Sequence, residues 1–115
     1  MENVVTSEVA AEARPVVAGL GKLYSACTAA AGGSALKKRE LEDSSKRLGA
    51  LLWRLNRRDV SPSVLAKLQQ LCAALERGDV AAGLAVHVAL TGADWDEASS
   101  WLPALKRLLK TRAML

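Results

Sequence analysis

Phenylalanine and isoleucine do not occur in this chain of 115 residues, and its aromatic side chains are three tryptophans and one tyrosine. Sheets favour aromatic and β-branched residues, whereas this chain is rich in alanine and leucine, which favour helices. Half of the residues are hydrophobic, which is enough for one core at this length. The composition therefore predicts a single all-α domain.

Long uncharged runs are also missing. The run from Leu23 to Leu36 is too short to cross a bilayer and contains glycine, serine and threonine. Glu2 is unfavourable at the start of a secretory signal. We therefore expect no membrane span and no targeting segment, and a cytoplasmic location.

Residues that usually carry out catalysis are scarce. The one histidine, His87, lies among apolar residues, which favours a packed, hydrogen-bonded histidine over a general base. Cys27 and Cys72 each fall inside an apolar helical pattern and are predicted to be reduced core residues without a metal. Gly19-Leu20-Gly21-Lys22 lacks the spacing of a phosphate loop. We expect no catalytic set, no metal site and no cofactor.

The chain carries a formal net charge of +4 and has a pI near 9.4. This charge is compatible with an acidic partner, but it is also ordinary for a soluble domain. Acidic and basic residues alternate locally, and few aromatic side chains are present that could stack on bases. Nucleic-acid binding is therefore not expected.

Proline, glycine and acidic residues divide the apolar pattern into five predicted helices. They begin at Pro15, at Ala35 or Leu36, at Pro62, at Val80 and at Asp94. Residues 1–14 are predicted to be partly disordered, and residues 15–115 to form one five-helix bundle. In the fourth helix we expect one shared face of Val80, Leu84, His87 and Val88.

The fifth helix has the clearest start signal. Asp94 is a good N-cap, and Glu97 stands three residues later, where a capping box would place it. Pro103 lies inside the pattern and predicts either a kink or a new helical start near Ser100. The apolar face is predicted to contain Trp95, Trp101, Leu102, Leu105, Leu108 and Leu109.

Basic residues gather at the ends of the second and fifth helices. The helix dipole alone explains both groups, but two clusters that met in the fold would form a surface for an acidic partner, and the sequence favours neither explanation. Trp53 is the best candidate for an exposed tryptophan, and a tryptophan beside arginine is typical of interface hot spots. The candidate contact residues are Trp53, Arg54, Arg57, Arg58, Lys106 and Arg107.

Several separate blocks resemble a known family. They are Ser45–Asn56, Leu68–Leu75 with Gly78-Asp79, Asp94–Glu97, Trp101-Leu102, and Leu105–Arg107. In sequence and spacing these blocks are similar to the C-terminal domain of the large outer-cage subunit of the COPII vesicle coat, in its plant and algal forms. That domain is in turn similar to the C-terminal domain of steroid receptor RNA activator protein.

This resemblance covers residues from about Pro15 to Arg112 and implies a five-helix bundle at the end of a larger protein. It implies a non-enzymatic module that docks on other coat proteins: the small GTPase of the inner layer, its activating subunit and the outer-cage partner. The implied location is endoplasmic reticulum exit sites and COPII vesicles, peripheral to the membrane. Two alternatives remain open: an RNA-binding or transcriptional coregulator module, and a module that only stabilises its parent chain or self-associates.

Overall fold

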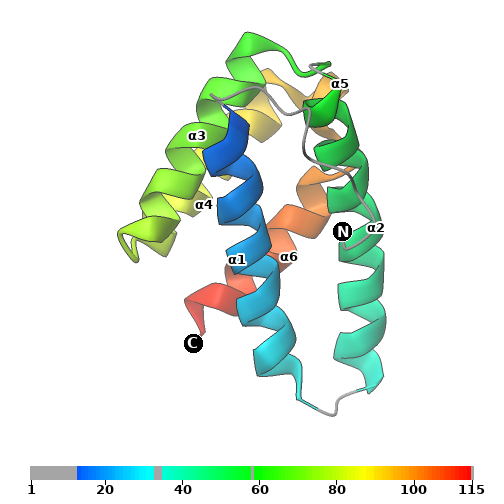
Figure 1. Cartoon of the computed structure of the whole chain (residues 1–115). Helices are drawn as coiled ribbons and strands as arrows, with labels where there is room; N and C mark the ends of the chain where they lie inside the picture. The colour runs from blue at the N-terminus through cyan, green and yellow to red at the C-terminus, as the bar shows by residue number, and fades with distance from the viewer. Residues whose placement is uncertain (1–12, 33–34, 58, 115) are drawn as a thin grey trace.

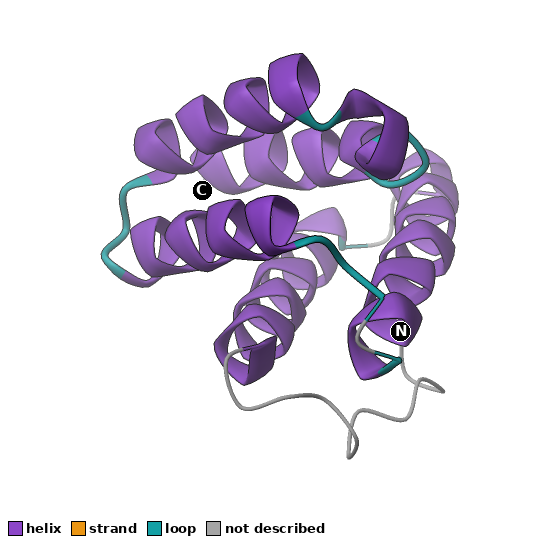
Figure 2. Ribbon diagram, turned by 90° about the horizontal axis from the view of Figure 1, so that it is seen from above, coloured by secondary structure: helices purple, strands orange, loops and turns teal. Residues whose placement is uncertain are grey.

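The computed structural model describes residues 13–32, 35–57 and 59–114, and in these ranges every regular element is a helix (Figure 2). The all-α prediction is confirmed, but the described ranges contain six helices instead of five. The prediction for residues 1–14 falls outside the described residues except at Ala13 and Arg14, where α1 begins. The helices are α1 (Arg14–Ala31), α2 (Ala35–Asn56), α3 (Pro62–Glu76), α4 (Val80–Ala93), α5 (Trp95–Ala98) and α6 (Leu102–Ala113).

Helix α6 lies in the middle of the bundle and contacts α1, α2 and α4. In Figure 1 it crosses behind the long pair formed by α1 and α2, while α3 and α4 lie on the other side of α1 from α2. Five of its side chains are buried: Leu102, Ala104, Leu105, Leu108 and Leu109. Leucines from α1, α2 and α3 complete this core, as the helical spacing predicts.

The connections around α3 follow the sequence signals. Ser61 caps α3, because its hydroxyl oxygen accepts a hydrogen bond from the Val64 N–H at 3.3 Å. Gly78 has a φ of 77°, a left-handed conformation that glycine adopts without strain. Asp79 then caps α4 by accepting a hydrogen bond from the Ala82 N–H at 3.0 Å. These predicted boundaries are confirmed.

The predicted capping box is wrong. Asp94 stands at the N-cap of α5, but its carboxylate makes an ion pair with Lys67 of α3 and no cap hydrogen bond. The Glu97 carboxylate accepts a hydrogen bond from the Ser61 N–H at 3.0 Å instead of one from Asp94. Both carboxylates therefore join α5 to α3 and its N-cap, because a charge-assisted contact between elements replaces the local bond.

The predicted fifth helix is two helices. The α-helix ends at Ala98, and α6 begins at Leu102 with Pro103 in its first turn, where the missing N–H costs no hydrogen bond. Of the two outcomes predicted for Pro103, the new helical start is thus the observed one. The start of a second helix turns the chain, and this turn allows the Trp101 side chain to be buried, with only 1% of it exposed.

Two apolar side chains predicted to be buried are exposed. Trp95 is 47% exposed, because the break after α5 removes it from the face that α6 buries. Val88 is 69% exposed, whereas Gly83, His87 and Leu90 of the same helix are buried. Val88 follows His87 by one residue, which turns it about 100° around the helix and out of the core.

A cluster of charged side chains joins α2 to α6 on the outside of the bundle. Asp43 accepts hydrogen bonds from Arg107 at 2.6 Å and from Arg47 at 3.1 Å. Arg47 also donates to the Ser100 carbonyl oxygen at 2.8 Å, just before α6 begins. The hydrogen bonds from Arg107 and then Arg47 lower the pKa of Asp43 below 3.8. We call these three residues the Asp43 cluster.

Helices α1 and α3 pack tightly against each other at Gly19 and Cys72. A Cβ atom built on Gly19 would lie 2.7 Å from the Cys72 sulfur and 2.8 Å from its Cβ. The same helix contains Gly21, around which a Cβ atom would meet nothing within 4 Å. Gly19 is therefore required by packing, whereas Gly21 weakens α1 without a packing reason.

We predict opposite effects from one substitution at these two glycines. Gly19→Ala should lower the free energy of unfolding by about 1–3 kcal/mol, because the new methyl group overlaps Cys72. Gly21→Ala should raise it by up to about 1 kcal/mol, because alanine is the better helix former. Urea unfolding followed by circular dichroism measures both. An equal gain at both positions would contradict the close approach of α1 and α3.

We also predict that the stabilising effect of Asp43 depends on pH. Because its pKa is lowered in the folded state, its contribution is present above 3.8 and is lost as the pH falls through the lowered value. Asp43→Asn should therefore reduce the urea midpoint at about pH 7 but not at about pH 2. Asp96→Asn, which changes an exposed carboxylate of α5, is the control. A loss that persists unchanged in acid would exclude the ionic contribution.

Candidate interaction surfaces

Trp53 and Arg57 form an exposed pair at the C-terminal end of α2. Trp53 is 52% exposed, which confirms the sequence prediction for this side chain. The guanidinium carbon of Arg57 lies 4.6 Å from the centroid of the indole ring, so the two side chains make a cation–π contact. The contact orders both side chains before any partner arrives.

Arg54, on the same turn of α2, has a structural role. It donates a hydrogen bond to the Glu97 carbonyl oxygen of α5 at 3.4 Å. Together with Glu97, Asp59 and Ser61 it lines an open depression of about 490 Å³ at the C-terminal end of α2. Arg54 therefore borders the exposed pair while holding α5 against α2.

Arg107 of α6 lies away from the Trp53–Arg57 pair. Arg107 belongs to the fold through Asp43, and it also donates to the hydroxyl group of Ser44 at 3.4 Å. Asp43 and Arg57 are separated by roughly 20 Å along α2, at 1.5 Å per residue. Lys106 is exposed on α6, and Arg58 lies outside the described residues. Arg107, from the basic cluster of α6, therefore lies far from Arg57, in the basic cluster at the end of α2.

His87 is a packing residue, as predicted. It is 6% exposed, and its Nε2 lies 2.8 Å from the carbonyl oxygen of Leu102. A carbonyl oxygen can only accept, so Nε2 carries the hydrogen and donates it. The histidine thereby fixes the first residue of α6 against α4.

Both cysteines are reduced and buried, as predicted. Burial raises the pKa of the Cys72 thiol to about 11, and burial also raises that of Cys27 although the Arg112 charge opposes it. Neither thiol is therefore an activated nucleophile at neutral pH.

Within ranges 13–32, 35–57 and 59–114, no three His, Cys, Asp or Glu side chains gather into a metal site. In the same ranges, no helix has the length and apolar character of a membrane span.

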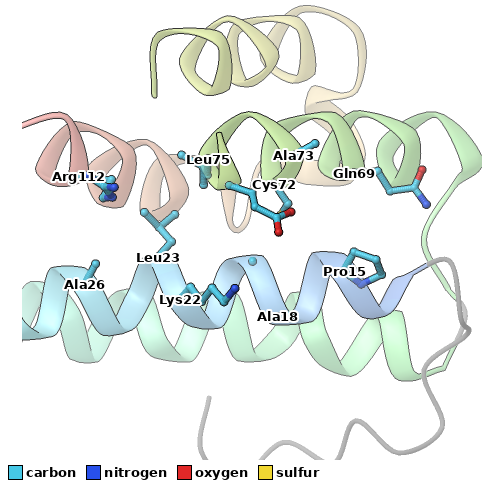
Figure 3. Close-up of a pocket in the computed structure, with 12 residues that line it drawn as sticks. Pro15, Ala18, Lys22, Leu23, Ala26, Gln69, Cys72, Ala73, Leu75 and Arg112 are labelled. Atoms are coloured by element: carbon cyan, nitrogen blue, oxygen red, sulfur yellow. The ribbon is translucent and has the colours of Figure 1, made fainter. Parts of the chain in front are cut away.

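A groove of about 500 Å³ runs between α1 and α3 and ends at the last turn of α6. Figure 3 shows Pro15, Ala18, Lys22 and Ala26 on its α1 side, with residues of α3 facing them and Arg112 at one end. Sequence reasoning did not identify this groove. Its walls consist mostly of small apolar residues, which look like ordinary helix-forming residues in the sequence.

The comparisons with known proteins give one consistent family. The chain is 44% identical over 107 residues to Protein transport protein SEC31 homolog B of Arabidopsis thaliana, a match that covers 90% of this chain and 10% of that protein. It is 38% identical over 73 residues to mouse Sec31B, covering 63% of this chain and 6% of the relative. Rat Sec31A is 32% identical over 79 residues, and this match covers 68% of this chain and 6% of the rat protein.

No family model and no solved structure matches the chain. The chain spans about a tenth or less of the length of the three relatives described, so it corresponds to one part of such a protein. The likeness to steroid receptor RNA activator protein stays a prediction. The COPII resemblance of the sequence blocks is confirmed, because these blocks lie in a chain that matches proteins named Sec31 in both plants and animals. The chain is therefore homologous to one region of the protein transport proteins named Sec31.

Proposed function

We propose that this bundle is a non-catalytic interaction module of the outer layer of the COPII coat. It docks on other coat proteins and so supports vesicle budding from the endoplasmic reticulum. Its partners are the small GTPase of the inner layer, the activating subunit and the outer-cage partner, and it works at exit sites and on coated vesicles in the cytoplasm. The homology to proteins named Sec31 supports the coat role.

The observation that carries the docking role is the ordered Trp53–Arg57 pair. An exposed tryptophan offers a large apolar surface, and arginine and tryptophan are among the residues most enriched at interface hot spots. Because Arg57 already stacks on the ring, less side-chain entropy is lost when a partner binds. The further candidate contacts are Arg54, on the same turn of α2, and Lys106, which is exposed on α6.

The chemistry of the interior supports a non-enzymatic role. His87 uses its Nε2 to hold the start of α6, and both thiols are buried with raised pKa values. In the part of the chain that is described, these are the side chains best suited to nucleophilic or acid–base catalysis. All three instead contribute to packing.

We predict that the exposed pair dominates docking. In the full-length subunit, Trp53→Ala or Arg57→Glu should weaken recruitment to purified inner-layer proteins on liposomes by roughly thirtyfold, equivalent to about 2 kcal/mol for a hot-spot residue. Helicity by circular dichroism should not change, because both side chains are exposed.

Lys46→Glu is the matched control for the charge reversal, since Lys46 is also exposed on α2 but lies at the middle of the helix, eleven residues before Arg57. It should bind within about twofold of the parent protein. Recruitment that is equally insensitive to Trp53→Ala, Arg57→Glu and Lys46→Glu would overturn the Trp53–Arg57 surface. Recruitment that is unaffected by deleting the whole module would overturn the docking function.

A further inference from the structure

The groove between α1 and α3 has an apolar floor that the chain itself does not fill. Gly19 and Cys72, where the two helices pack tightly, both line the groove, and Ala18, Ala26 and Ala73 contribute only small side chains to its lining (Figure 3). Its volume of about 500 Å³ lies within the range of sites that bury a ligand. Apolar side chains of a partner would therefore find a ready depression there.

Two of the helices around this groove, α1 and α6, carry only positively charged side chains. Neither α1 nor α6 contains an aspartate or a glutamate. Lys22 of α1 and Arg112 of α6 both line the groove, opposed by a single carboxylate, Glu76 of α3. The cations of the two helices are Arg14, Lys22, Lys106, Arg107, Lys110 and Arg112.

Two of these six cations line the groove. Lys22 lines it from α1, and Arg112 lines it from the last turn of α6 (Figure 3). Among the described residues, the ion pairs join Asp43 to Arg47 and Arg107, and Lys67 to Asp94. Lys22 and Arg112 take no part in these pairs.

We propose that the groove binds an acidic amphipathic peptide segment of another coat protein. Its apolar side chains lie on the floor between α1 and α3, and its carboxylates meet Lys22 and Arg112. A docked peptide of this kind uses the same physics as an amphipathic segment in a hydrophobic groove. The proposal rests on the proposed coat function but concerns a different surface from Trp53 and Arg57.

Other occupants fit the groove less well. A single-stranded nucleic acid stacks its bases on aromatic side chains, and none of the described residues that line the groove is aromatic. A second copy of the bundle docked face to face on the same groove would bring Lys22 and Arg112 close to their own counterparts, and like charges repel. An acidic amphipathic peptide suits both the apolar floor and the two cations, Lys22 and Arg112.

Site-specific crosslinking tests the occupant directly. A photoreactive amino acid replaces Ala18, an exposed groove residue, in the full-length subunit, which is then assembled with purified coat proteins on liposomes. The same replacement at Ala85, exposed on α4, is the control. We expect an adduct from position 18 alone, on a coat-protein peptide with aspartate or glutamate beside apolar residues. No adduct, or an adduct on another copy of the bundle, on nucleic acid or on a basic peptide, overturns the proposal.

Substitutions supply the second measurement. Ala18→Trp fills the groove, and Lys22→Glu with Arg112→Glu reverses its charge; each should weaken binding of the crosslinked coat protein at least about tenfold, while Ala85→Trp should not. If Arg57→Glu abolishes coat binding and the groove variants bind like the parent, the groove proposal fails and the docking function stands. If deletion of the module changes nothing, the docking function itself fails.

Discussion

The burial of α6 is the interaction on which the rest of the structure depends. Five of its twelve residues are apolar and buried between helices that precede it in the chain. Three side-chain contacts fix it in place: His87 at its first residue, Arg107 through Asp43, and Cys27, whose thiol lies 3.3 Å from the Leu108 carbonyl oxygen. With α6 held from inside, α1 to α4 can present their outer faces to partners.

Local signals in the sequence predict the fold well wherever one or two residues decide the backbone. Ser61-Pro62 and Gly78-Asp79 do so through a cap hydrogen bond and a left-handed φ, and both boundaries are found as predicted. The capping box of Asp94 and Glu97 is wrong because partners distant in sequence, Lys67 and Ser61, compete for the two carboxylates. No local pattern reveals such a competition.

In the candidate surfaces, too, features set by nearby residues could be predicted and features set by distant partners could not. Exposure of Trp53 could be predicted from its place at the edge of the apolar stripe, and its pairing with Arg57 follows from their spacing of one helical turn. The structural use of Arg107 could not be predicted, since Asp43 is far away in sequence. The groove was missed for a different reason: it arises from what alanine and glycine leave unfilled when α1 meets α3.

The central claim is that the bundle is fully formed before it docks and offers its outer faces to other coat proteins. Hydrogen–deuterium exchange of the full-length subunit, free and in the assembled coat, tests this claim most directly. The account predicts equally slow exchange of the Leu102–Ala113 amides in both states, with assembly slowing exchange at the C-terminal end of α2 and along α1. Fast exchange throughout α6 in the free subunit that becomes slow only in the coat would contradict it.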